Sequence, residues 1–123
     1  MQLAHHTVGS SAPPFIIAEM SGNHNQSLER ALAIVEAVAA SGAHALKLQT
    51  YTADTMTLDL REREFFIDDP HSPWHGNSLY QLYQLAHTPW EWHAPLFARA
   101  RELGLVVFST PFDASAVEFL QSL

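Results

Sequence analysis

The feature that most constrains the fold is an apolar strand followed by a loop, a capped helix, a short turn and a second apolar strand. The string FIIAE at 15–19 is typical of a buried strand, and ALKLQT at 45–50 is typical of another. Between them, residues 27–41 space apolar side chains for one helical face, with Ser27 as the predicted N-cap and Gly42 just past the end. A strand reached through a helix and so short a turn pairs in parallel with its predecessor.

The same order is repeated further along the chain. LVVFST at 105–110 predicts a third strand. The segment before it predicts a helix in which Thr88 is the N-cap, Pro89 occupies the first turn and Glu91 completes a capping box. Gly104 is expected to end that helix.

Two more helices are predicted outside these units. The string PFDASAVEFLQSL at 111–123 predicts a loop and then a helix from about Ser115, with Val117 and Leu120 on its inner face. The long connection at 51–87 predicts a helix in NSLYQLYQLAH and a surface loop in DDPHSPWHGN.

The aromatic residues of this region leave two interpretations open. They could form a sugar-stacking platform, or they could pack helices onto the sheet, with Trp74 closing over its end. The set consists of Trp74, Tyr80, Tyr83, Trp90 and Trp92.

The ends of the strands decide between two α/β architectures. An open doubly wound sheet favours a glycine-rich phosphate loop after the first strand, but MSGNHNQ holds a single glycine. A (β/α)₈ barrel places polar residues at the carboxyl ends of its strands, and the polar residues found there are Glu19, Lys47, Gln49, Thr50, Ser109 and Thr110. We therefore predict parallel (β/α) units that form the first part of a TIM barrel.

The expected domain organisation is incomplete. A whole barrel takes roughly 250 residues, whereas this chain has 123 residues and about three strands. Residues 15–123 are expected to form the N-terminal portion of the barrel, truncated after the third unit. Residues 1–14 are expected to form an irregular lead or a short edge hairpin.

Charge and composition exclude several classes of partner. Thirteen acidic residues against six basic ones give a net charge of −7 without any basic cluster, which argues against a nucleic-acid partner. There is no cysteine, and neither a secretory signal nor a run of roughly 20 apolar residues is evident. These features predict a cytoplasmic protein with no membrane partner.

Lys47 is the only lysine, and it stands between two leucines. Because side chains alternate along a strand, Lys47 and Gln49 share one face, while the leucines point to the other face. The matching face of the first strand carries Glu19, within reach of the ammonium group. Two interpretations follow: a buried structural ion pair, or a cation that binds a phosphate or carboxylate together with the hydroxyl of Thr110.

The loop after the first strand is a second candidate. GNHN at 22–25 places Asn23 and His24 at the catalytic end of a barrel strand, where they could bind substrate or merely form turns and cap the helix. His71 and His75 have a spacing that suggests metal binding, but they flank a proline in a loop and lack a third ligand. No metal site is expected within this chain.

Longer strings resemble a known family. FIIAEMSGNHNQSLERALAIVEAVAASGAHALKLQTYTADTMTLD and FSTPFD are similar to the N-terminal barrel of the sialic acid synthase family, and NSLYQLYQLAHTPWEWH is most like its pseudaminic acid synthase branch. The resemblance implies a TIM barrel, a small C-terminal domain and a homodimer. It also implies condensation of phosphoenolpyruvate with an N-acetylated amino sugar, with release of phosphate.

The resemblance further implies roles for particular residues. Lys47 matches a lysine that contacts phosphoenolpyruvate, Thr110 matches a hydroxyl on the phosphate side, and Gln49 matches a residue near the acceptor sugar. Glu19 matches an acidic residue close to the reacting centre. Asn23 and His24 lie beside it, and Thr50 and Ser109 are included as substrate-binding candidates. A divalent metal, Mn²⁺ or Mg²⁺, is expected for the full-length enzyme, with ligands outside this chain.

Three possibilities therefore remain at the level of sequence. The first is part of a synthase that is inactive as this piece alone. The second is a non-catalytic module that self-associates through uncovered strands. The third is a different phosphoenolpyruvate-condensing barrel.

Overall fold

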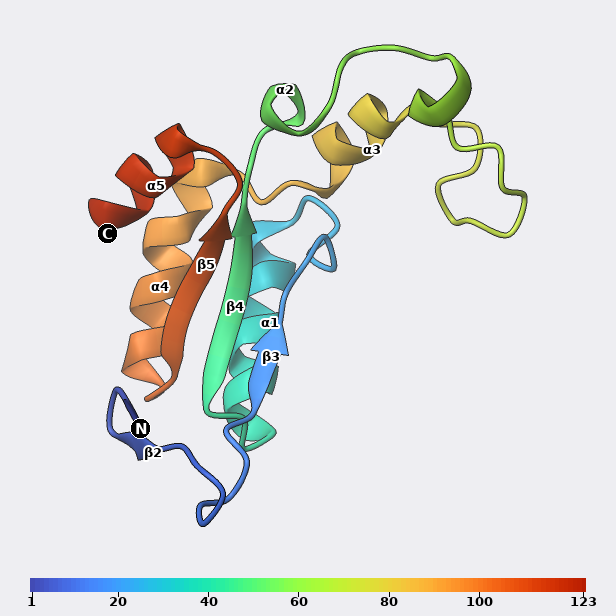
Figure 1. Ribbon diagram of the computed structural model, residues 1–123. Helices are drawn as coiled ribbons and strands as arrows, with labels where there is room; N and C mark the ends of the chain where they lie inside the picture. Colours follow the sequence, from blue (N-terminus) through green and yellow to red (C-terminus); the bar gives the residue numbers. More distant parts are fainter.

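A three-stranded parallel sheet forms the centre of the molecule. The computed structural model describes all residues 1–123. The strands β3 (Ile17–Glu19), β4 (Ala45–Thr50) and β5 (Val106–Pro111) lie side by side in that order and point the same way (Figure 1). The prediction of successive parallel β/α units is confirmed.

Two helices cover one face of this sheet. Figure 1 shows α1 (Leu28–Ala40) and α4 (His93–Glu102) together behind the strands. Their apolar faces, the leucines of β4 and two residues next to β3 and β5 form the core, which consists of Met20, Ala31, Val35, Leu46, Leu48, Leu96, Phe97, Ala100 and Leu105. As predicted, the Ser27 hydroxyl caps α1 by accepting the Arg30 amide at 3.2 Å, and Gly42 follows the helix with a φ of +80°.

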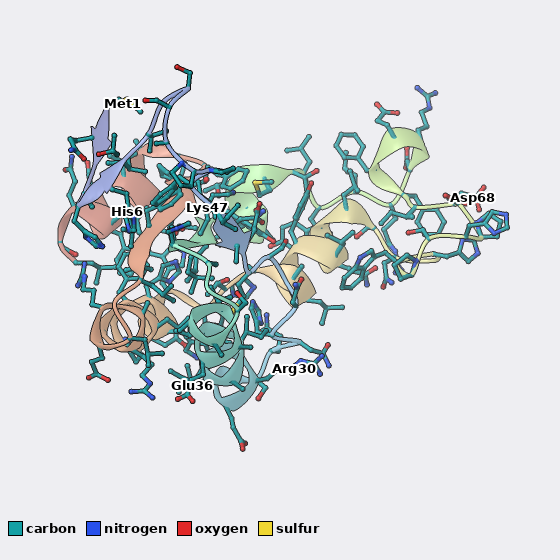
Figure 2. The ribbon with its side chains drawn as sticks, turned by 90° about the horizontal axis from the view of Figure 1, so that it is seen from below. Met1, His6, Arg30, Glu36, Lys47 and Asp68 are labelled. Atoms are coloured by element: carbon teal, nitrogen blue, oxygen red, sulfur yellow. The ribbon has the colours of Figure 1, made fainter.

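The other face of the sheet is not covered by a helix. Leu46 and Leu48 are fully buried on the helix side, whereas Lys47 and Gln49 point away from it, so the predicted alternation along β4 is confirmed. In Figure 2, Lys47 lies on the opposite side of the sheet from Arg30 and Glu36 of α1. The open face also exposes Ile17 by 47% and Phe108 by 37%. Parallel sheets are normally buried on both faces, so this open face matches the interior of a barrel.

Smaller elements lie at the two ends of the sheet. A two-stranded hairpin, β1 (Gln2–Leu3) with β2 (His6–Thr7), lies below the amino ends of the strands (Figure 1). A short hairpin was one of the two structures predicted for residues 1–14. At the carboxyl ends, the 51–87 connection contributes α2 (Ala53–Met56), a 3₁₀ turn η1 (Arg63–Phe65) and α3 (Leu79–Ala86). The helix α3 was predicted, whereas α2 and η1 were not. No helix combines the length and the apolar character needed to cross a membrane.

The predicted capping box at Thr88 is wrong. The chain first forms a 3₁₀ turn, η2 (Trp90–Trp92), and α4 begins only at His93 without a side-chain cap. The Thr88 hydroxyl is buried and lies 3.3 Å from Nε2 of His24. The Thr88 side chain thus makes a tertiary hydrogen bond to His24 instead of capping the helix.

The last helix begins one residue earlier than predicted. Asp113 is the N-cap of α5 (Ala114–Gln121), and its carboxylate accepts the amide of Ala116 at 3.0 Å. Counting from this cap, Ala116 and Leu120 face inward, whereas Val117 is 40% exposed rather than internal as predicted. The first and third strands differ slightly as well, because β3 begins at Ile17 and β5 is shifted by one residue.

A buried chain of hydrogen bonds joins the sheet to the start of α4. Nδ1 of His93 lies 3.2 Å from the Trp90 carbonyl, so this nitrogen carries the proton and Nε2 accepts. The Thr50 hydroxyl therefore donates to Nε2 at 2.8 Å and accepts from the Ser109 hydroxyl at 2.6 Å. This chain fixes β4, β5 and the η2 segment to one another.

Replacing Thr50 by valine is expected to destabilise the fold. Thr50→Val keeps the shape but leaves Nε2 of His93 without its buried donor, which should lower the free energy of unfolding by about 1–3 kcal/mol. Urea denaturation of the protein expressed from its complete reading frame measures this. Thr57→Val, at a position whose hydroxyl makes no hydrogen bond within the chain, is the control, and equal stability of the two variants would contradict the assigned role of Thr50.

Candidate functional site

The open face carries a polar cluster that spans all three strands. The register places Glu19 beside Lys47, and Gln49 beside Thr110. The Lys47 ammonium lies 2.9 Å from Oε1 of Glu19 and 3.4 Å from the Thr110 hydroxyl. The Gln49 amide donates to the same oxygen of Glu19 at 2.8 Å. These four residues, all predicted from sequence, lie together at the carboxyl ends of the strands, and we refer to them as the Lys47 cluster.

The hydrogen bonds of the cluster leave groups free to meet a ligand. An ammonium has three donors, and two of them are directed to Glu19 and Thr110. Oε1 of Glu19 accepts twice, while its Oε2 accepts no hydrogen bond from the protein. The hydrogen bonds from Lys47 and then Gln49 lower the pKa of Glu19, so its carboxylate is ionised at neutral pH.

The ion pair is not buried. The Lys47 side chain is 25% exposed and that of Glu19 is 42% exposed. An accessible pair of this kind contributes only about 0–1 kcal/mol to stability. Within residues 1–123 the ammonium is therefore accessible to an anionic ligand.

Two predicted binding residues lie away from the cluster. Thr50 and Ser109 point to the helix side of the sheet, where they form the chain to His93. The reason is parity, because Thr50 follows Gln49 and Ser109 precedes Thr110 on their strands. Thr50 and Ser109 were predicted as binding residues because they adjoin Gln49 and Thr110 in sequence. The alternation of side chains along each strand places them on the opposite face of the sheet.

The loop after β3 contains one buried and one exposed candidate. His24 is fully buried, and its Nδ1 accepts a hydrogen bond from the backbone N–H of Gln26 at 3.2 Å. Its other nitrogen therefore carries the proton and donates to the Thr88 hydroxyl at 3.3 Å. Asn23, in contrast, is exposed and lines a cavity. The structure thus gives His24 a role in holding the loop, while Asn23 is the member of the pair that a ligand can reach.

That cavity has a volume of about 330 Å³ and lies between the first loop and α3. Sequence reasoning missed most of its wall, because the residues come from four separate segments with no common motif. Burial, and then the charge of Tyr83, raise the pKa of Tyr51 to about 12, so its hydroxyl stays protonated. The lining residues are Ser21, Gly22, Asn23, Gln49, Tyr51, Trp74, Leu82, Tyr83 and Ala86.

Comparison with known proteins identifies the family. The sequence profile of the NeuB family matches residues 34–123. The chain belongs to the NeuB family. This confirms the family predicted from the sequence strings.

Members with similar sequences act in sugar biosynthesis. The chain is 50% identical over 111 residues to pseudaminic acid synthase of Helicobacter pylori (strain ATCC 700392 / 26695), which covers 90% of this chain and 32% of that protein. It is 46% identical over 107 residues to pseudaminic acid synthase of Campylobacter jejuni subsp. jejuni serotype O:2, covering 87% of this chain and 31% of that protein. The chain thus spans about a third of the length of the curated relatives that it matches.

Solved structures support the fold of this NeuB family chain. The crystal structure of N-acetylneuraminic acid synthetase from Leptospira borgpetersenii serovar Hardjo-bovis, in complex with citrate, matches with a TM-score of 0.78 at 24% identity. The match covers 99% of this chain and 37% of that one. A spore coat polysaccharide biosynthesis protein from Bacillus subtilis matches with a TM-score of 0.66 at 37% identity, over 99% and 30% of the two chains. The predicted placement in the first part of a TIM barrel is confirmed.

Metal-binding side chains are not clustered as ligands of one ion in this chain. No group of three or more His, Asp or Glu side chains is arranged to hold an ion. His71 and His75 lie at exposed positions in the 66–77 loop, which extends far from Lys47 together with Asp68 (Figure 2). The Mn²⁺ or Mg²⁺ expected for the full-length enzyme stays a prediction.

Acid is expected to destabilise this part of the NeuB protein. Burial lowers the pKa of His24 and His93 below the ordinary 6.5, so the folded state holds both imidazoles neutral. As the pH falls to 6.5 and below, the two imidazoles take up protons in the unfolded chain before they do so in the folded one. The stabilisation from keeping them neutral is therefore complete above pH 6.5 and is lost as the pH falls below it. Denaturation midpoints measured at pH 7.5, 6.5 and 5.5 should fall in that order.

Substitution separates these histidines from other titrating groups. His24→Gln should flatten the loss of stability between pH 6.5 and 5.5, whereas His71→Gln, at an exposed loop position, should leave it unchanged. The same slope in His24→Gln and the unsubstituted protein would show that His24 does not carry the effect.

Proposed function

We propose that this chain is part of a nonulosonic acid synthase, of the pseudaminic or sialic acid type, that condenses phosphoenolpyruvate with an N-acetylated amino sugar. The observation that carries the proposal is the Lys47 cluster, an accessible ammonium held on the open inner face at the carboxyl ends of barrel strands. The names of the relatives support it, because they include pseudaminic acid synthases and N,N'-diacetyllegionaminic acid synthases.

The proposed reaction forms one carbon–carbon bond and exchanges the C2–oxygen bond to phosphate for a C2–oxygen bond from water. C3 of phosphoenolpyruvate attacks the aldehyde carbon of the open-chain sugar, which leaves C2 electron-poor, and the aldehyde oxygen takes up a proton. Water adds at C2, and phosphate leaves with the oxygen that joined it to C2 while the oxygen from water becomes the keto oxygen. The two protons of that water balance the proton on the former aldehyde oxygen and the proton that phosphate carries away. The negative charge of phosphoenolpyruvate must be held in place throughout, which is electrostatic work for fixed cations and donors.

The Lys47 cluster supplies part of that work. The ammonium of Lys47 and the hydroxyl of Thr110 are proposed to bind phosphoenolpyruvate, since both lie on the open face within 3.4 Å of each other. The free Oε2 of Glu19 is proposed to orient the water that adds, and Gln49 to face the acceptor. Asn23 is proposed as a further contact, whereas His24, Thr50 and Ser109 are proposed to hold these residues in position from the buried side.

This portion of the chain is proposed to be inactive alone. The positive charge of Lys47 is balanced by the negative charge of Glu19, whose Oε1 lies 2.9 Å from the ammonium. The cluster therefore has no net charge with which to neutralise phosphoenolpyruvate. Further cations, a divalent metal with ligands outside this chain and a second subunit of a homodimer are all proposed to complete the enzyme.

A self-associating module is the second candidate. It is favoured by the apolar side chains on the open face, where Ile17 is 47% exposed and Phe108 is 37% exposed. The two candidates differ in the reading frame that encodes the chain: a synthase requires the remaining barrel strands, and a stop codon directly after Leu123 would favour the module.

Removing the lysine is expected to abolish efficient use of phosphoenolpyruvate. In the protein expressed from its complete reading frame, Lys47→Ala should lower kcat/KM for phosphoenolpyruvate by about 100-fold, because a fixed cation at a developing charge is lost. Phosphate release is assayed with phosphoenolpyruvate, a divalent metal and a panel of N-acetylated amino sugars.

A cation on the opposite face provides the control. Arg99→Ala removes a guanidinium that pairs with Glu36 and Glu102 on the helix layer, and it should leave kcat/KM within about twofold, as for surface ion pairs. Near-normal turnover in Lys47→Ala would remove the basis of the proposal.

A further inference from the structure

Three histidines lie close together at the amino ends of the strands, at the end of the sheet opposite to the Lys47 cluster. His5 and His6 belong to the β1–β2 hairpin, and His44 lies in the turn between α1 and β4. The ring centroids of His5 and His6 are 4.2 Å apart, and those of His6 and His44 are 4.9 Å apart. Figure 2 shows His6 on the opposite side of the sheet from Glu36 of α1. The imidazoles are not arranged to hold a metal ion, so another role has to account for their proximity.

Aromatic contacts join the hairpin to the lead into the sheet. Phe15 stacks on His44 with 5.2 Å between ring centroids, and it packs edge-on against His6 at 5.1 Å. These rings line a pocket of about 270 Å³, which we call the histidine pocket. Its lining residues are His5, His6, Thr7, Ala12, Pro13, Pro14, Phe15 and His44. Because His5 is exposed and the other two imidazoles are partly exposed, protons from the solvent reach all three.

The His44 ring also holds the residue that precedes β3. Its Nδ1 accepts a hydrogen bond from the backbone N–H of Ile16 at 2.9 Å. The Ile16 carbonyl in turn accepts the backbone N–H groups of His44 and Ala45 at 2.9 and 3.2 Å. An imidazolium carries a proton on both nitrogens and cannot accept a hydrogen bond. The bond from Ile16 to the ring therefore exists only while His44 is neutral.

The surroundings of the three imidazoles offer no negative charge. None of the ion pairs of the chain includes a histidine. The Met1 ammonium, the other charged group of the hairpin, is positive and donates to the Val8 carbonyl at 2.9 Å. The segments before β3 and β4 add no other charged side chain to the lining. Partial burial, and then the charges of His5 and His44, lower the pKa of His6, so a proton on one ring disfavours a proton on the next.

We propose that the histidine pocket is a proton-sensitive latch, which holds the β1–β2 hairpin against the amino ends of the sheet while its imidazoles are neutral and releases the hairpin when they are protonated. Protonation acts in two ways. It removes the acceptor of the Ile16 N–H, and it places like charges on rings that lie side by side.

The direction of the pH dependence follows from the neutral state. An imidazole that the folded state keeps neutral contributes stability that is complete above the ordinary pKa of 6.5 and is lost as the pH falls below it. The latch is therefore closed at pH 7.5 and opens towards pH 5.5. It acts at the amino ends of the strands, so this inference does not depend on the reaction proposed for the carboxyl ends.

Amide hydrogen exchange, corrected for the intrinsic exchange rate at each pH, measures the release. In the protein expressed from its complete reading frame, the protection of the Val8 and Ile16 amides should fall by about 10-fold or more between pH 7.5 and 5.5. The amides of α1 in the same sample report the separate effect of acid through His24 and His93. Protection that is equal at the two pH values, or that falls only in parallel with α1, would overturn the proposal.

Substitution assigns the effect to the imidazoles. In His44→Asn the side-chain oxygen can accept in place of Nδ1 but does not titrate, and His5→Gln with His6→Gln removes the other two titrating groups. The triple variant should lose no more protection on acidification than α1 does. His75→Gln, at an exposed loop position, is the control and should keep the full pH dependence. A triple variant that loses protection as steeply as the unsubstituted protein would contradict the latch.

A direct titration keeps the proposal testable if the triple variant fails to dock its hairpin. The NMR signals of the imidazole C–H groups follow each histidine of the unsubstituted protein, and His6 should take up its proton at a lower pH than the exposed His75. Titration of His6 and His75 at the same pH would show that the folded state does not keep His6 neutral, and the latch would be ruled out.

Discussion

The parallel pairing of β4 with its two neighbours is the constraint on which the rest of the structure depends. A shift of one residue would turn Lys47 toward the helices and place Leu46 and Leu48 on the open face. Each buried leucine contributes about 1.5–3 kcal/mol, whereas an accessible ion pair contributes about 0–1 kcal/mol. The leucines therefore fix the register, and the contact between Lys47 and Glu19 is a consequence of it.

Local patterns predicted the elements that bury an apolar face. The spacing around α1, the hydrophobic run of β4 and the glycines that follow α1 and α4 all led to elements in the expected places. Alternation along the strands also predicted three of the four members of the Lys47 cluster, because parity places Glu19, Lys47 and Gln49 on one face of the sheet. In these regions the physical rule acts over a few residues, and sequence suffices.

Other features depend on partners that are distant in sequence. Thr88 has the sequence context of a helix cap but contacts His24, 64 residues away. Thr50 and Ser109 resemble site residues by their place at strand ends, yet they bond His93 behind the sheet. The cavity likewise depends on the close approach of Gly22 to Ala86, which no local pattern encodes. Such pairings require the complete packing arrangement before they can be seen.

The Gln26 side chain donates hydrogen bonds to the carbonyls of Leu85 and His87, which bridge 59 and 61 residues. The ribosome releases β3, α1 and β4 before the α3 segment. The loop after β3 therefore cannot make these contacts until the α3 segment has emerged. Until then the Thr88 and Ala86 partners of His24 and Gly22 are missing, so the wall of the cavity is completed later than the first pair of strands is made.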